Sequence, residues 1–203
     1  MIHITLPELA PGSTLHLLCS WDEYQRMAQA RGDSSIPRMK YRNGEVLIMV
    51  PLPEHGKNAH LIARVAELLL EHDRRRYEAF TPVTMTIPQV GGIEPDYCFY
   101  VDPGSLVAVR GKTRIDWQND PPPDLVIEID VTSYSAAADY LPYQVPELWL
   151  YRERLRIYQL NEQQYQEVLE SSWFPGYDVK VFVETMLRIA YEQDTSAAIW
   201  WLR

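Results

Sequence analysis

The sequence predicts a single α/β or α+β domain spanning residues 1–203, in which helices pack on a mixed β-sheet. Two observations lead to this prediction: one long amphipathic helix is expected over residues 54–76, and strands dominate between residues 78 and 169. Such elements bury their apolar faces against one another in layers. With 203 residues, 46% of them hydrophobic, the chain is long enough for one well-buried domain and short for two.

The first half of the chain predicts two short elements, a hairpin and the long helix. Residues 14–19 favour a strand, and Ser20-Trp21-Asp22-Glu23 has the capping-box pattern that opens a helix, here to about residue 30. Asn43-Gly44 is a preferred two-residue turn and predicts a hairpin over residues 39–50. The helix of residues 54–76 carries Ile62, Val65, Ala66 and Leu69 on one face and ends in three arginines.

The second half of the chain predicts a series of strands followed by a helix. The strands are expected at residues 78–87, 94–101 and 124–131, and then as a meander at 146–151, 155–160 and 165–169. Residues 103–123 form a long connection, which is uncommon unless it has a function or is tied down. A helix is expected over residues 179–192, and residues 197–202 fit either a last helical turn or a packed tail.

Composition and charge exclude several classes of protein. The net charge of −9 argues against a protein that coats nucleic acid, although it is compatible with a nuclease, whose active site is itself acidic. Two cysteines without metal-finger spacing favour free thiols in a reducing compartment. No stretch approaches the ~18 apolar residues of a membrane span, so we expect a cytoplasmic protein without membrane contact.

The strand of residues 124–131 carries the most informative chemistry. Side chains alternate across a strand, so Asp124, Val126, Glu128 and Asp130 share one face, and the opposite face is entirely aliphatic. Carboxylates in an apolar setting are costly unless they coordinate a cation, share a proton or open onto a cleft. The pattern therefore fits a metal-dependent hydrolase, and equally a sheet edge at which both acids reach water.

The order of these signals resembles the PD-(D/E)xK nuclease superfamily. More narrowly, it resembles the Uma-type putative restriction endonucleases, a cyanobacterial family of unknown function. The resemblance runs from about residue 20 to 190. It rests on short motifs in the same order: Asn43-Gly44-Glu45, Met49-Val50-Pro51, His55-Gly56, Pro95-Asp96, Pro123 to Glu128, Val145-Pro146-Glu147-Leu148-Trp149 and Phe174-Pro175-Gly176.

The resemblance implies a restriction-endonuclease-like core, a mixed sheet flanked by helices, and an endonuclease that hydrolyses phosphodiester bonds. In that superfamily an aspartate and a glutamate bind Mg²⁺, and Asp96 and Glu128 match them. The backbone carbonyl of Ile129 is the third ligand that the superfamily suggests. An all-oxygen set of this kind prefers Mg²⁺ or Mn²⁺. The implied partner is nucleic acid, with DNA the first candidate.

The lysine of the superfamily is missing at its expected places. The third residue of Glu128-Ile129-Asp130 is an aspartate, and the alternative lysine position, four residues before Tyr140, is Ala136. Asp130 could bind metal, or it could be a hydrogen-bonded acid beside Thr132 or Ser133. His55 could contact the metal site, or it could be satisfied by backbone at the helix start. Lys57 is a candidate for a migrated lysine, and an exposed first-turn lysine explains it as well.

Two functional hypotheses follow. The first is a Mg²⁺-dependent endonuclease, slow because the lysine is absent. The second is a non-catalytic protein of nuclease fold that binds metal or nucleic acid or serves as an interaction module. A surplus of tryptophan in the last third of the chain also predicts a homodimer, because aromatic residues are enriched at interfaces. These tryptophans are Trp149, Trp173, Trp200 and Trp201.

Overall fold

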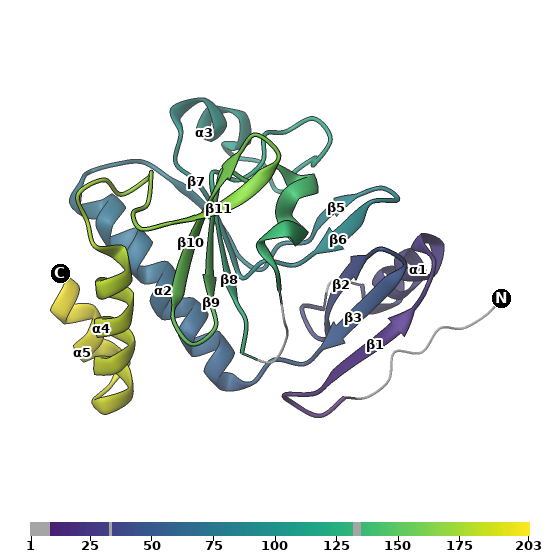
Figure 1. Cartoon of the computed structure of the whole chain (residues 1–203), viewed down its shortest axis with the longest axis horizontal. Helices are drawn as coiled ribbons and strands as arrows, with labels where there is room; N and C mark the ends of the chain where they lie inside the picture. Colours follow the sequence, from purple (N-terminus) through teal and green to yellow (C-terminus); the bar gives the residue numbers. More distant parts are fainter. Residues whose placement is uncertain (1–8, 33, 132–134) are drawn as a thin grey trace.

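A computed structural model describes residues 9–32, 34–131 and 135–203 of the chain. It contains two β-sheets with helices packed around them (Figure 1). The elements in the first half are β1 (Thr14–Leu18), α1 (Trp21–Arg31), β2 (Arg38–Arg42), β3 (Glu45–Met49), α2 (Pro53–His72), β4 (Glu78–Phe80), β5 (Met85–Ile87), β6 (Gly91–Ile93) and β7 (Tyr97–Tyr100). The second half has α3 (Pro103–Val109), β8 (Leu125–Ile129), the 3₁₀ helix η1 (Ala137–Tyr143), β9 (Glu147–Tyr151), β10 (Leu155–Asn161), β11 (Gln164–Val168), α4 (Val179–Glu192) and α5 (Thr195–Leu202).

The larger sheet has six strands in the order β11-β10-β9-β8-β7-β4. Strands β8 and β9 run parallel, and the other neighbouring pairs are antiparallel. The sheet is therefore mixed, as predicted, and with its flanking helices it gives an α+β fold.

One face of this sheet is covered by α2, which runs diagonally behind it in Figure 1, and by α4, with α5 packed against both helices. The main apolar core lies between these layers. Leu125, Ile127 and Ile129 of β8 pack there with Trp149 and Phe174, all fully buried. The aliphatic face expected from the alternation along residues 124–131 is thus the core face, and the acidic residues of that strand point to the other side of the sheet.

The smaller sheet has five strands in the order β1-β3-β2-β6-β5, with α1 packed against it. The hairpin of β2 and β3 turns at Asn43 and Gly44, whose φ angles of 52° and 79° are those of the expected tight turn. The helix α1 begins with the predicted capping box, in which Ser20 and Glu23 satisfy each other's backbone N–H groups. This hairpin brings β2 to the acidic face of the larger sheet.

Several elements differ from the sequence prediction. The expected strand 78–87 is two strands in different sheets, β4 and β5, because the chain turns at Thr81-Pro82. The connection 103–123 contains α3, whose N-terminus is capped by the Asp102 carboxylate. Helix α2 ends at His72, so the three arginines follow it rather than close it.

No helix among the described residues is long and apolar enough to cross a membrane. Cys19 and Cys98 are both free thiols.

Candidate functional site

The site is built first by the pairing of β7 with β8. Tyr97 lies opposite Ile127, and continuing this antiparallel register by one residue places Asp96 opposite Glu128. The Asp96 N–H donates to the Ile127 carbonyl at 3.1 Å, which fixes this end of the strand. Asp96 is 7% exposed and Glu128 is 9% exposed. The two acids that the resemblance singled out are therefore buried neighbours on one face of the sheet.

Asp96 is held in its ionised form by three groups. Arg38 Nη1 lies 2.5 Å and His55 Nε2 lies 2.8 Å from Asp96 Oδ1, and the Ile129 N–H donates to Asp96 Oδ2 at 2.8 Å. Burial alone would raise the pKa of Asp96, but the Arg38 charge, then His55 and the Ile129 N–H, bring it below its ordinary value. A carboxylate of this kind remains negative at neutral pH.

Glu128 has the opposite character. Its Oε1 accepts a hydrogen bond from the Ser135 hydroxyl at 2.9 Å, and the Tyr140 hydroxyl lies beside the same carboxylate. Its buried Oε2 meets no partner at full hydrogen-bond geometry among the described residues. Burial, and then the negative charge of Asp96, raise the pKa of Glu128 above its ordinary value. A buried carboxylate oxygen without a partner is rare in proteins, and such an atom calls for a bound water, ion or ligand.

Two basic residues of β2 face these acids from the other sheet. Arg38 contacts Asp96 and also donates to the Glu94 carbonyl. Lys40 Nζ donates to Ser135 Oγ at 3.1 Å and pairs with Asp139 at 2.7 Å. The Lys40 side chain is 17% exposed, and burial lowers its pKa, although the charge of Glu128 opposes that shift. The site is therefore an interface between the two sheets, with acids on one side and cations on the other.

A small cavity separates these groups. Its volume is about 20 Å³, and its polar lining comes from Arg38, Lys40, Glu94, Glu128 and Ser135. A space of this size holds one water molecule or ion. Glu128 thus borders a space that two cationic side chains share.

The acidic pair fits a divalent cation with few protein ligands. Within the described ranges, no group of three or more His, Cys, Asp or Glu side chains is arranged to hold a metal. Mg²⁺ usually keeps several waters and binds through one or two carboxylates, so Asp96 and Glu128 would be sufficient. The unpartnered Glu128 Oε2 favours such an ion. Arg38 opposes it, because its guanidinium occupies Asp96 Oδ1 and would have to leave that oxygen.

The structure brings His55 to the site, and it gives Asp130 a different environment from Glu128. His55 Nε2 lies 2.9 Å from Arg38 Nη1 as well as 2.8 Å from Asp96, so this nitrogen either donates to the carboxylate or accepts from the guanidinium. Asp130 is fully buried and binds Arg152 at 2.5 Å and the Ser135 N–H at 2.8 Å. Thr132 and Ser133, the partners expected for Asp130, lie outside the described residues.

Ile129 reaches the site through its backbone N–H, which donates to Asp96 Oδ2, and its side chain packs in the core on the opposite face. The role predicted for its carbonyl as a metal ligand stays a prediction. Lys57 lies elsewhere: its Nζ donates to the Ala190 carbonyl at 2.8 Å and rests over the Tyr191 ring. Lys57 therefore faces α4 rather than the acidic pair, so it does not replace the missing lysine of the superfamily.

Sequence reasoning missed Arg38 and Lys40. Their only signal is the alternation of basic and apolar residues along Arg38-Met39-Lys40-Tyr41-Arg42, which is typical of a half-buried strand. Nothing in that pattern indicates which face meets the acids.

Comparisons with known proteins bear on the fold and the family of the chain. No curated protein matches the chain. Among solved structures, the chain is similar to a putative nuclease belonging to DUF820 from Anabaena variabilis ATCC 29413. The TM-score is 0.53 at 14% identity, over 91% of this chain and 99% of that one. Residues 21–174 match the Uma2 family, described as "Putative restriction endonuclease", so the chain belongs to the Uma2 family.

Proposed function

We propose that this protein is a metal-dependent endonuclease that hydrolyses phosphodiester bonds of nucleic acid, with DNA as the first candidate substrate. The observation that carries the proposal is the buried pair of Asp96 and Glu128 beside a small cavity that Arg38 and Lys40 also line. One Glu128 oxygen forms no hydrogen bond within the part of the chain that the structure describes. The family and the nuclease-like fold support the same reaction class.

The ion would be Mg²⁺ or Mn²⁺, held by the Asp96 and Glu128 carboxylates and the Ile129 carbonyl. The chemistry that such an ion supplies is a lowered pKa of coordinated water and neutralisation of charge on the phosphate. His55 orients the Asp96 carboxylate through the 2.8 Å contact. Asp130 holds Ser135 and Arg152 beside the site, because it binds both the Ser135 N–H and the Arg152 guanidinium.

In this proposal Lys40 replaces the lysine that the superfamily has and this chain lacks. The Ala136 N–H and Lys40 Nζ meet at the same atom, Asp139 Oδ2, at 3.1 and 2.7 Å. The ammonium group of Lys40 therefore lies close to the backbone position at which the resemblance expects a lysine. From there it stabilises negative charge that develops on the phosphate during hydrolysis, since positioned cations in a water-poor site act strongly on such charge.

The experiment is cleavage of plasmid DNA, single-stranded DNA and RNA in Mg²⁺ or Mn²⁺, compared with EDTA. Wild-type protein should cleave at least one of them only with metal. Asp96→Asn and Glu128→Gln should each abolish cleavage and calorimetric Mn²⁺ binding while the circular dichroism spectrum stays unchanged. Mn²⁺ binding as tight as that of the wild type in either variant would show that the site is elsewhere.

A second candidate is a non-catalytic protein of nuclease fold that binds metal or nucleic acid or acts as an interaction module. The observation that favours it is Ala136 at the expected lysine position. Mn²⁺ binding that needs Asp96 and Glu128, without cleavage of any of the three substrates, would select this candidate over the endonuclease.

We also propose a homodimer in the cytoplasm. Trp149 is fully buried and Trp173 packs against the core, so the tryptophan surplus that motivates a dimer reduces to Trp200 and Trp201, which are both exposed on α5. Two free cysteines fit a reducing compartment.

A further inference from the structure

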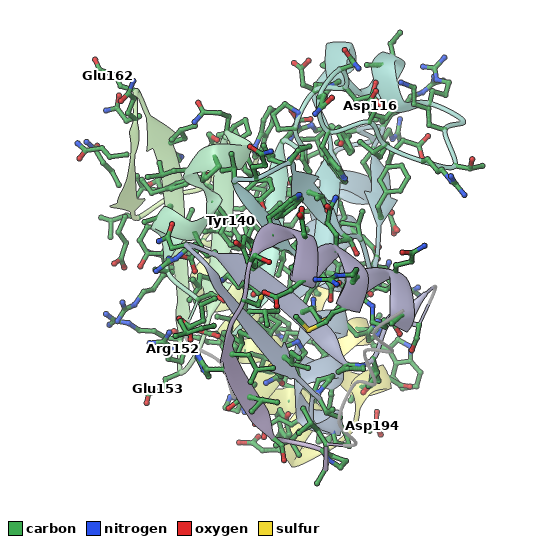
Figure 2. All side chains as sticks on the ribbon, turned by 90° about the vertical axis from the view of Figure 1, so that its right-hand side faces the viewer. Asp116, Tyr140, Arg152, Glu153, Glu162 and Asp194 are labelled. Atoms are coloured by element: carbon green, nitrogen blue, oxygen red, sulfur yellow. The ribbon has the colours of Figure 1, made fainter. Side chains whose placement is uncertain are left out.

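Three arginines gather at the turn between β9 and β10. Arg152, Arg154 and Arg156 line a groove of about 340 Å³ together with Ser135, Ala136 and Leu150. All three arginines are exposed. Figure 2 shows Arg152 and Glu153 at the rim of the molecule, on the same side as Tyr140. The groove is therefore a basic surface on a chain whose net charge is −9.

The strand registers align this groove with the acidic pair. Glu128 lies opposite Leu150 on β9, and Leu150 lies opposite Arg156 on β10. Residues in one row across a sheet share a face, so Glu128, Leu150 and Arg156 all point away from the helical core. Neighbouring strands are ~4.8 Å apart, which places the Arg156 backbone roughly 10 Å from that of Glu128. This span corresponds to about three nucleotides at ~3.4 Å per step.

Ser135 joins the groove to the acidic site. It lines both the groove and the small cavity at Glu128, and its hydroxyl lies between Lys40 Nζ and Glu128 Oε1. Arg152, whose side chain is 41% exposed, is anchored beside it by the 2.5 Å contact with Asp130. The basic groove and the small cavity at Glu128 therefore share Ser135 as a common lining residue.

The three arginines differ in the contacts that their guanidinium groups already make. Arg152 is tied to Asp130, and Arg156 interacts with the Tyr158 side chain. The Arg154 guanidinium forms no hydrogen bond or ion pair with residues 9–32, 34–131 and 135–203. Among the described residues that line the groove, Glu153 is the one acidic residue. Arg154 is therefore the arginine best able to take an anionic ligand, and Arg156, which is exposed beside it, is the second candidate.

We propose that this groove binds the phosphodiester backbone of the substrate strand, on one side of the bond that is cut. The inference rests on the proposed function and adds to it the path of the strand, from Arg154 and Arg156 past Ser135 to Glu128. Guanidinium groups bind phosphate oxygens through paired hydrogen bonds, which suits a cluster of arginines rather than a single charge. Contacts of this kind hold the strand without selecting a base sequence.

The test is binding of a fluorescent 20-nucleotide strand, single or annealed to its complement, measured by anisotropy in EDTA from 50 to 200 mM salt. The double variant Arg154→Gln/Arg156→Gln removes two positive charges from the groove. The matched control, Arg26→Gln/Arg188→Gln, removes two charges from the exposed surfaces of α1 and α4. Thermal unfolding of both variants verifies that they fold.

Two lost phosphate contacts should reduce the salt slope of the duplex by about 1.8 and weaken its binding on the order of 50-fold near 0.1 M salt. The control should change affinity by less than about threefold, because its charges are screened beyond ~10 Å. Glu153→Gln should tighten binding several-fold, since it removes the negative charge that competes with phosphate in the groove.

The results distinguish failure of the groove proposal from failure of the endonuclease proposal. Equal losses in the groove variant and the control, with unchanged affinity in Glu153→Gln, would overturn the groove while wild-type cleavage leaves the endonuclease standing. Wild-type protein that neither binds nor cleaves any nucleic acid would overturn both proposals.

Discussion

Lys40→Met is the most direct probe of the proposed chemistry. The substitution keeps an unbranched apolar side chain of similar length and removes the ammonium group that pairs with Asp139 and Ser135. The Asp139 carboxylate remains paired with Arg42, so the fold should persist. The change therefore isolates the positive charge that borders the cavity at Glu128.

The magnitude follows from the burial of that charge. A unit charge ~4 Å from a developing negative charge contributes about 4 kcal/mol at an effective dielectric constant of 20. At 1.36 kcal/mol for each factor of ten, this corresponds to roughly 10³ in rate. Removal of one positioned donor of charge stabilisation typically costs 10²–10³, so the two estimates agree.

The assay is single-turnover cleavage of plasmid DNA in Mg²⁺, with calorimetric Mn²⁺ binding measured in parallel. Lys40→Met should lower the cleavage rate 10²–10³-fold without weakening Mn²⁺ binding, because the variant lacks a cation that repels a metal ion at Glu128. The double variant Lys40→Met/Ala136→Lys, which introduces a lysine at the position expected from the superfamily, should recover part of the cleavage rate. The reason is that the Ala136 N–H and the Lys40 ammonium group both contact Asp139 Oδ2.

The control is Lys57→Met, which removes a lysine that faces α4 and should leave cleavage unchanged. A Lys40→Met protein that cleaves within twofold of wild type would refute the assignment. An equal loss in Lys57→Met would show that general charge, rather than the position of Lys40, sets the rate.

Three further predictions concern stability and assembly. Glu128→Gln should raise the thermal midpoint of unfolding in EDTA. The difference from wild type should grow as the pH rises above about 4.5, because the folded-state pKa of Glu128 lies above its ordinary value of 4.5 and the wild-type protein must then bury a charge. A constant difference from pH 4 to 8 would contradict this. Gly92→Ala should cost about 1–3 kcal/mol and be detected by urea unfolding, because its Cβ overlaps the ring and hydroxyl of buried Tyr24, and an unchanged midpoint would argue against that packing. Light scattering should give a dimer mass at micromolar concentration, and Trp200→Ser/Trp201→Ser should give a monomer, whereas a monomeric wild type would reject the dimer.

The acidic half of the site could be predicted from the sequence because its signals are local. Alternation along residues 124–131 separates Glu128 from the aliphatic core residues, and the same alternation appears in the structure. Asp96 follows a proline at the start of a strand. Each inference needs only a few consecutive residues.

The basic half could not be predicted, because it depends on docking of distant segments. Arg38 meets Asp96 across 58 positions, and Lys40 meets Ser135 across 95. Strand propensity gives β2 but leaves open which sheet its charged face approaches. Helix α3 was missed for another reason: it has seven residues, too few for a periodic pattern, although Asp102-Pro103 is a good helix start.

The separation of charge between the two sheets has a consequence for folding. The three cations of β2 alternate at Arg38, Lys40 and Arg42, and they pair with acids that come later in the chain. A one-residue slip of β2 would turn all three toward the opposite face and present Met39 and Tyr41 to the carboxylates. The ion pairs therefore favour the correct register of β2, which the hairpin turn also sets, over a slipped one. The proposed nuclease activity would then depend on correct docking of the N-terminal sheet. A chain with β2 in the wrong register would lack it even where its six-stranded sheet is fully formed.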